Sequence, residues 1–185
     1  MKLYTRGGDE GGTDLLFGGR VSKADVRVAA TGAVDTAVSA MGLARALCRD
    51  ARVKEVLLRV QRQGFTVGAE LATDPEQHER LAQRFAPVTA EMTAGLESLI
   101  DDLQGRMELP QAFIVPGGSS GSGALDLARS LVRAAERRVV ELHEAGRLAN
   151  PEVLRFLNRL SDLLFVLARF EDRELPVELA SDGDR

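Results

Sequence analysis

The second half of the chain carries a row of charged residues whose spacing suits a binding face. Arg129, Arg133 and either Glu136 or Arg137 are separated by intervals of three or four residues, so a helix would place them on one side. On spacing alone, such a row is most often a solvated charged face. The charges alternate with three alanines, Ala128, Ala134 and Ala135. This alternation argues against a solvated face and is typical of a face that packs closely against something, so both interpretations stay open.

Two polar residues interrupt the strongly apolar segment 151–170. Asn158 and Asp162 are four residues apart and would share one face of a helix. Both residue types are unfavourable inside helices, and buried polar groups need partners. The basic face of the preceding helix could supply those partners. A structural hydrogen-bond network and a binding site are equally consistent with this pair.

Two glycine-rich segments could surround a phosphate group. Segment 4–13 offers backbone donors, hydroxyl groups, an arginine and Asp9, whose carboxylate could enter a magnesium shell. Its composition fits a flexible tail equally well. Neither this segment nor 117–123 has the spacing of a P-loop, and Asp126 stands where a third dinucleotide-binding glycine would fall. The usual nucleotide-binding folds are therefore excluded, and a glycine–serine linker is the favoured interpretation of 117–123.

Helical periodicity covers most of the chain that must position these groups. The expected helical segments are 24–50, 51–72, 74–103 with a break near Pro87, 123–144 and 151–170. The sequence thus predicts one all-α domain over 1–185, built from four or five antiparallel helices. A glycine-rich arm over 1–22 precedes the helices, and a polar tail over 171–185, expected to be mobile at its end, follows them.

The composition limits the function further. A formal net charge of −4 argues against nonspecific nucleic-acid binding, which relies on a cationic surface. With one cysteine, Cys48, and two histidines, neither an intrachain disulfide nor a structural zinc cluster is expected. The sequence shows no signal peptide and no apolar run of the roughly 20 residues that span a membrane. It predicts a soluble, cytoplasmic protein without a nucleic-acid or membrane partner.

Four stretches of the chain form an ordered set of motifs. They are Thr5-Arg6-x-Gly8-Asp9-x-Gly11-x-Thr13, then Arg20-Val21-x-Lys23 followed by Arg27, then Phe113-Ile114-Val115-Pro116-Gly117-Gly118, and finally Asn158-Arg159-Leu160-Ser161-Asp162. Together with the arginine-rich row described above, this set resembles the PduO-type ATP:cob(I)alamin adenosyltransferases. The resemblance extends from Tyr4 to about Arg169, and the ordered set is far more specific than any single motif.

The resemblance implies a five-helix antiparallel bundle in a ferritin-like arrangement, assembled as a homotrimer with active sites between adjacent subunits. Such enzymes transfer the 5′-deoxyadenosyl group of ATP to the cobalt of cob(I)alamin and release triphosphate, usually with Mg²⁺. By position, the residues that would hold ATP are Thr5, Arg6, Gly8, Asp9, Gly11, Thr13, Lys23, Arg27, Arg133, Glu136, Asn158 and Asp162. Asp35 and Arg129 match a pair that bridges subunits, and Phe113 matches an aromatic residue that closes the lower face of the corrin.

This reaction needs no nucleophile from the protein, because cob(I)alamin is itself a strong nucleophile. The enzyme must bring cobalt and ATP together and stabilise charge on the leaving triphosphate, a task for Arg133 and the other basic residues. An apolar wall such as Phe113 would displace the lower axial base and make cobalt(II) easier to reduce. The implied partners are a reductase and a B12-dependent enzyme that accepts the product.

Several positions depart from the family pattern. Thr36 and Val38 stand where the family commonly has glutamate and asparagine, Ala134 replaces an arginine, and Asp126 replaces a histidine. Loss of the two polar groups at 36 and 38 favours an alternative, in which a catalytically weak or inactive relative binds ATP or cobalamin for delivery or sensing. A purely structural helical bundle is a third interpretation.

Overall fold

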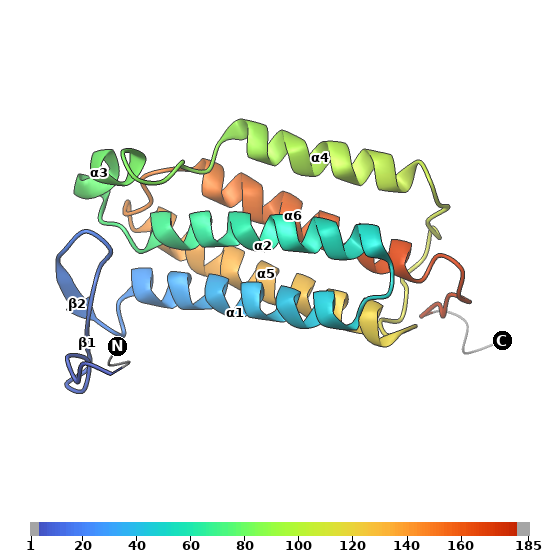
Figure 1. The fold of residues 1–185 in the computed structure, drawn as a ribbon, viewed down its shortest axis with the longest axis horizontal. Coiled ribbons are helices and arrows are strands. Elements are labelled where there is room, and N and C mark those ends of the chain that lie inside the picture. The colour runs from blue at the N-terminus through green and yellow to red at the C-terminus, as the bar shows by residue number, and fades with distance from the viewer. Residues whose placement is uncertain (1–3, 181–185) are drawn as a thin grey trace.

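A computed structural model describes residues 4–180 as an elongated bundle of helices (Figure 1). Within that range the long helices are α1 (Val26–Leu47), α2 (Ala51–Leu71), α4 (Ala90–Gln104), α5 (Ser120–Glu144) and α6 (Glu152–Glu171). The shorter elements are β1 (Gly12–Asp14), β2 (Arg20–Ser22), a 3-10 turn at Pro75–Gln77 and α3 (His78–Ala82). The prediction of an all-α bundle with five long helices is confirmed.

Four of the helices form the bundle and the fifth lies outside it. α1 packs on α2 and on α5, α5 packs on α6, and α4 covers α6 from the outer side (Figure 1). The short connections between α1 and α2, and between α5 and α6, make each of these pairs antiparallel. α4 and α6 run in the same direction, because α4 ends and α5 begins at the same end of the bundle, so that α5 runs antiparallel to both (Figure 1).

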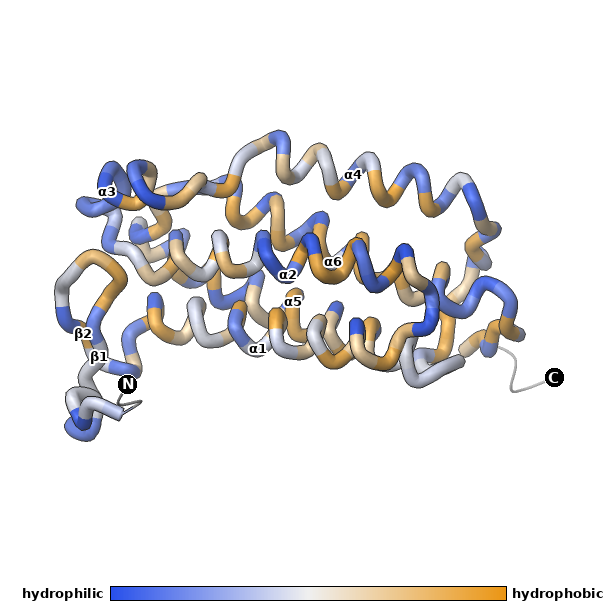
Figure 2. Tube along the Cα trace, in the orientation of Figure 1, coloured by the Kyte–Doolittle hydropathy of each residue, from blue (hydrophilic) through white to orange (hydrophobic). Residues whose placement is uncertain are grey.

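Alanines line the most extensive helix contact, which is that between α1 and α5. Ala30, Ala37 and Ala44 of α1 are spaced by seven residues and are almost completely buried. Ala128 and Ala135 of α5 have the same spacing and no exposed surface. Residues seven apart lie on one stripe of a helix, and small side chains let two helix backbones approach closely. Larger apolar residues fill the remaining core, most densely along α6 (Figure 2).

Side-chain caps decide where the helices begin. Asp25 caps α1, Asp50 caps α2 and Thr89 caps α4, each accepting from backbone N–H groups of the first turn. Ser119 and Ser122 form a reciprocal capping box. α5 therefore begins at Ser120, three residues before the predicted start at 123, and the linker interpretation of 117–123 is wrong for its last four residues.

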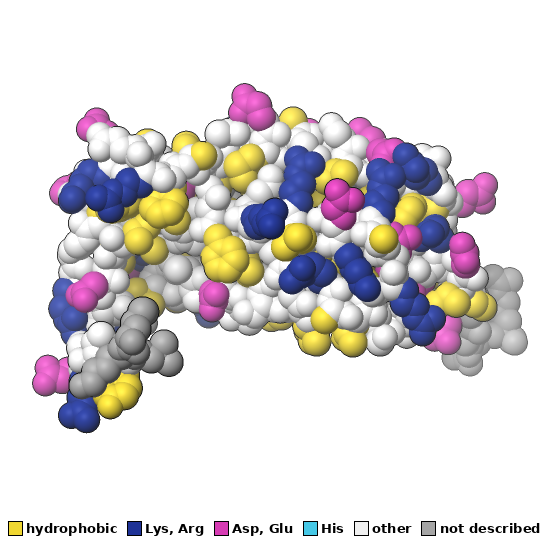
Figure 3. All heavy atoms as spheres, viewed as in Figure 1, with side chains coloured by type: hydrophobic (Ala, Val, Ile, Leu, Met, Phe, Trp, Pro, Cys, Tyr) yellow, Lys and Arg dark blue, Asp and Glu magenta, His cyan; other side chains and the backbone are white. Residues whose placement is uncertain are grey.

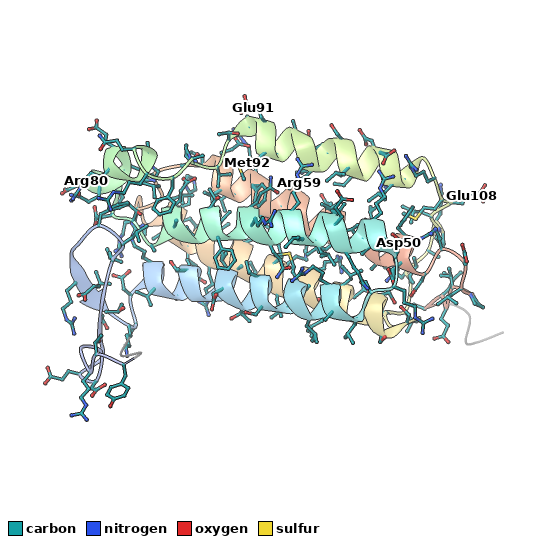
Figure 4. The ribbon with its side chains drawn as sticks, viewed as in Figure 1. Asp50, Arg59, Arg80, Glu91, Met92 and Glu108 are labelled. Carbon is teal, nitrogen blue, oxygen red and sulfur yellow. The ribbon has the colours of Figure 1, made fainter. Side chains whose placement is uncertain are left out.

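The N-terminal arm ends in a small antiparallel hairpin, an element that the sequence did not predict. Thr13 of β1 pairs with Val21 of β2, and Gly18 and Gly19 adopt the positive φ angles that such a tight loop requires. The Leu16 amide donates to the Ala72 carbonyl at 2.9 Å, which fixes the hairpin to the end of α2. Arg80 of α3 lies on the same end of the bundle (Figure 4) and donates to the Phe17 carbonyl at 3.4 Å.

Two glycines of α2 allow a direct test of the helix spacing. A Cβ atom added at Gly64 would lie 2.5 Å from Val38 Cγ2 of α1, whereas one added at Gly68 would meet nothing within 4 Å. We expect Gly64→Ala to destabilise the fold by about 1–3 kcal/mol through overpacking. The control Gly68→Ala should stabilise it by about 0.5–1 kcal/mol through helix propensity. Urea unfolding of both variants measures the difference, and equal stabilities would show that α1 and α2 do not approach this closely.

Candidate functional site

The charged row of α5 lies beside α6, because Arg129 contacts the Phe165 ring and Glu136 accepts from Asn158. Figure 3 shows the face of α1, α2 and α4, where basic and apolar side chains are mixed. In α5, Ala128, Val132 and Ala135 are fully buried, so the residues that follow them in sequence turn towards the surface. Arg129 is half-buried and Arg133 is exposed. The shared face predicted from spacing is thus formed by α5 at its border with α6.

Glu136 and Asn158 form one part of this border. The Asn158 side-chain amide donates to Glu136 Oε1 at 2.9 Å, and Asn158 Oδ1 accepts from Arg159 at 2.8 Å. The partner of Asn158 on α5 is therefore acidic, whereas the sequence suggested a basic one. Arg133 lies one turn before Glu136 and makes no hydrogen bond or ion pair within residues 4–180. Its guanidinium is available to an anionic ligand.

A cavity of about 660 Å³ adjoins the N-terminal half of α5. Phe113, Arg129 and Asp162 line it together. Phe113 is 88% exposed, an unusual state for a large aromatic side chain. Asp162 is exposed, and its nearest cation is Arg159, 4.0 Å away on the same helix.

Sequence reasoning missed the residues that support Arg129 in this cavity. The guanidinium of Arg129 lies 5.6 Å from the centre of the Phe165 ring, and that of Arg169 lies 5.4 Å from it, both within range of a cation–π interaction. Arg169 is buried and pairs with the buried Asp126 at 2.5 Å. An arginine within the apolar run of α6 was the signal that could have revealed this pair.

Burial and the ion pair with Arg169 shift the pKa of Asp126 in opposite directions. Burial raises the pKa of Asp126 above its usual value, and the charge and hydrogen bond of Arg169 only partly oppose this effect. Asp126, which stands where the family commonly has a histidine, forms a buried ion pair with Arg169 that joins α5 to α6. Breaking such a pair by removing one partner typically costs about 3–5 kcal/mol.

The arm residues gather at the other end of the bundle around Lys23. The Lys23 side chain donates to the Gly8 carbonyl and the Lys23 amide to the Gly11 carbonyl, both at 2.8 Å. Thr5, Arg6 and Asp9 are exposed on the same loop, and Arg6 has a positive φ angle of 61°. The arm is therefore a folded loop with several exposed polar groups.

Thr13 and Asp35 line a second cavity, of about 520 Å³, between the hairpin, α1 and α2. Asp35 is exposed and has no partner within residues 4–180. This cavity shares no residue with the one lined by Arg129, so the two members of the expected Asp35–Arg129 pair lie apart in one chain.

Arg27 occupies a different position from the one expected of a phosphate ligand. Its side chain is only 2% exposed, and its guanidinium donates to the carbonyls of Leu71, Thr73 and Arg147 at 3.1, 2.8 and 2.8 Å. Burial lowers the pKa of Arg27 and Arg147 adds to this effect, although the group stays cationic. Arg27 binds backbone carbonyls at the C-terminal end of α2, just beyond that end and after α5, and it is not available to a phosphate in this structure.

Part of the predicted tail is ordered and lies against the loop that carries Phe113. Ile114 and Leu179 form an antiparallel bridge. The Val115 amide donates to the Glu178 carbonyl and the Ala180 amide to the Phe113 carbonyl, both at 2.8 Å. The predicted mobile end of the tail, 181–185, lies outside the described residues.

The part of the chain that the structure describes contains no reactive thiol, no cluster of metal ligands and no membrane-spanning helix. Cys48 is buried, and burial, reinforced by the charge of Glu171, raises the pKa of its thiol to about 12, which disfavours the thiolate. No group of three metal-ligating side chains occurs among residues 4–180. None of the described helices is long and apolar enough to cross a membrane.

The chain is similar to known corrinoid adenosyltransferases. The corrinoid adenosyltransferase PduO of Citrobacter freundii is 40% identical over 174 residues, covering 94% of this chain and 51% of that protein. The chain therefore spans about half the length of that relative. Another corrinoid adenosyltransferase of the same organism is 39% identical over 171 residues, covering 92% of this chain and 95% of that protein.

A solved structure has the same fold. A variant PduO-type ATP:corrinoid adenosyltransferase from Lactobacillus reuteri, complexed with cobalamin and ATP, aligns with a TM-score of 0.88 and 34% identity. The alignment covers 98% of this chain and 100% of that one. Residues 3–171 also match the family model described as cobalamin adenosyltransferase. The chain therefore belongs to the cobalamin adenosyltransferase family.

Proposed function

We propose that this protein transfers the 5′-deoxyadenosyl group of ATP to the cobalt of cob(I)alamin, giving adenosylcobalamin and triphosphate. Family membership and the names of the relatives support this reaction. The observation in this chain that carries the proposal is Arg133, an exposed cation without a partner among residues 4–180, one turn from the Glu136–Asn158 pair. An unpaired arginine beside an ordered polar pair suits the polyphosphate of a bound nucleotide.

The reaction proceeds by displacement at the ribose 5′ carbon of ATP. The electron pair of cobalt(I) forms the cobalt–carbon bond while the carbon–oxygen bond breaks, and that bonding pair leaves on the triphosphate. Arg133 and Lys23 stabilise the charge on this leaving group. Glu136 and Asn158 hold the nucleotide so that the 5′ carbon faces the cobalt. No protein nucleophile takes part, in agreement with the raised pKa of the Cys48 thiol.

Magnesium would bind with the triphosphate at the arm. Mg²⁺ usually keeps several waters and takes one or two carboxylates together with substrate phosphates. The exposed Asp9 offers one carboxylate, and the arm's exposed backbone offers further polar groups. The donor set therefore fits a magnesium ion held mainly by the nucleotide, with Asp9 as its protein contact. When phosphate binds, it replaces the Gly8 carbonyl as the partner of Lys23.

Two copies of the chain contribute to each site. The arm and the α5–α6 border lie on different parts of one chain, and Asp35 and Arg129 line separate cavities. A homotrimer in which Asp35 of one subunit meets Arg129 of the next would bring the two groups together. The expected partners are a cytoplasmic reductase that supplies cob(I)alamin and a B12-dependent enzyme that accepts adenosylcobalamin.

Phe113 forms the apolar wall below the corrin. Its side chain is 88% exposed beside the cavity of about 660 Å³, and a bound corrin would cover the exposed ring. In that position the ring excludes the lower axial base from cobalt(II). A four-coordinate cobalt(II) is easier to reduce to cobalt(I), which is the nucleophile of the reaction.

A second candidate function is binding of ATP or cobalamin without turnover. Thr36 donates to the Gly32 carbonyl of its own helix at 2.9 Å, and Val38 is buried. These positions therefore present no free polar group where the family commonly has two. An anaerobic assay with ATP, Mg²⁺ and chemically reduced cob(I)alamin separates the two functions. Equal amounts of adenosylcobalamin and triphosphate support the enzyme, whereas binding without either product supports delivery or sensing.

Replacing Arg133 should remove stabilisation of the leaving group. We expect Arg133→Ala to lower kcat/KM for ATP by about 10²–10³-fold, the usual effect of losing one charge-stabilising donor. Arg138→Ala is the matched control, since Arg138 is exposed on the same helix but pairs with Glu141 at 2.9 Å. Its activity should be unchanged. Full activity of Arg133→Ala would remove Arg133 from the triphosphate site.

Replacing Phe113 should act on the reduction step. We expect Phe113→Ala to lower turnover from cob(II)alamin with a chemical reductant far more than turnover from cob(I)alamin supplied already reduced. The reason is that only the first substrate depends on exclusion of the lower base. Steady-state assays with both substrates measure the ratio. A proportional loss with both would exclude the lower-face role.

A further inference from the structure

The loop that carries Phe113 has little support of its own. Phe113 is 88% exposed, so packing of its side chain does not hold it in place. Within the described residues, the hydrogen bonds of segment 108–118 are the two that join it to the tail, at Phe113 and at Val115. Two prolines and Gly117, which has a φ of 107°, restrict regular structure here.

The tail, by contrast, is attached to the bundle before it reaches the loop. Arg173 forms an ion pair with Asp50 at 2.9 Å and donates to the Phe170 carbonyl at 2.7 Å. Its guanidinium also lies 4.2 Å from the centre of the Phe170 ring. Asp50 is the cap of α2 and lies at the end of the bundle where α6 leads into the tail (Figure 4). The tail therefore leaves the bundle from a fixed point.

The pairing of loop and tail separates two cavities. Phe113 and Ile114 line the cavity of about 660 Å³ that also contains Arg129. Ile114 and Val115 line a neighbouring cavity of about 550 Å³, whose other side is formed partly by Glu178. A shift of the loop towards this neighbouring space would withdraw Phe113 from the first cavity. The two backbone hydrogen bonds to the tail oppose such a shift.

We propose that residues 178–180 are a positioning segment, which holds Phe113 against the lower face of the corrin through backbone pairing with residues 113–115. The role of Phe113 on which this rests is that of the proposed function. The tail touches neither reacting atom, and it acts only by fixing where the aromatic ring stands. Removal of the pairing lets the loop sample other positions, so that the lower base returns to cobalt(II).

Proline substitution in the tail tests the pairing with a close control. Ala180→Pro removes the amide that donates to the Phe113 carbonyl, whereas Glu178→Pro removes an amide that makes no hydrogen bond in the described structure and keeps the carbonyl that accepts from Val115. Both positions are exposed and lie outside the helices, so neither variant should alter the thermal unfolding of the bundle.

The first readout is hydrogen exchange of segment 108–118 in the protein without substrates. The Val115 amide should exchange faster in Ala180→Pro than in the unsubstituted protein and Glu178→Pro. This measurement does not depend on catalysis, so it remains decisive if the chain proves to bind its ligands without turnover. Identical exchange in all three proteins would overturn the proposal.

The second readout is the ratio of turnover from cob(II)alamin to turnover from chemically reduced cob(I)alamin. We expect Ala180→Pro to lower this ratio by about 10-fold, corresponding to the loss of one hydrogen bond, with Glu178→Pro unchanged. Electron paramagnetic resonance of bound cob(II)alamin should show more of the base-coordinated form. An equal loss with both substrates would overturn the positioning role, whereas absence of product from the unsubstituted protein with cob(I)alamin would refute the proposed function instead.

Discussion

The close packing of α1 against α5 is the constraint from which the candidate site follows. Buried alanines at seven-residue spacing on both helices, such as Ala37 and Ala135, allow this contact and fix the rotation of α5 about its axis. With the alanine stripe turned inwards, Arg129 and Glu136 necessarily reach the border with α6, where they meet Phe165 and Asn158. A larger residue in this stripe would separate the helices and rotate the whole charged row away from its partners.

The arginines of this chain divide into structural and available groups according to what surrounds them. Arg27 and Arg169 are buried, and each binds partners inside the fold through its terminal nitrogens, the first to carbonyls and the second to Asp126, while the Nε atom of each has no hydrogen-bond partner among the described residues. Arg133 is exposed and remains without a protein partner among residues 4–180. The free-energy cost of burying an unpaired charge explains this division. A buried arginine needs partners within the protein, whereas a solvated arginine can remain unpaired until a ligand binds. Proximity in a motif therefore does not by itself make an arginine a phosphate ligand.

The N-terminal arm and the loop that carries Phe113 are held in place by different contacts. The arm is held by a short hairpin and by contacts of Lys23 with its own backbone. Phe113 is held by a tail that starts from the Arg173–Asp50 ion pair. Both are loops fixed to the helices at a few points, an arrangement that leaves them able to adjust around a ligand. The charged row, in contrast, lies on a helix and has a fixed geometry.

Periodicity and motif order in the sequence were sufficient for the five long helices, the family and the residues that share the α5 face, because these depend on local spacing. Local spacing could not show that Ser119 would cap α5 three residues early, since a glycine–serine run fits a linker equally well. It could not show that Arg27 is buried, that Arg169 pairs with Asp126, or that Leu179 pairs with Ile114. Each of these contacts joins residues more than 40 positions apart in the chain, and packing of the helices brings them together. The types and spacing of the candidate residues were thus determined by the sequence, and their availability was decided by the tertiary structure, because burial and long-range partners settle which charged side chains can reach a ligand.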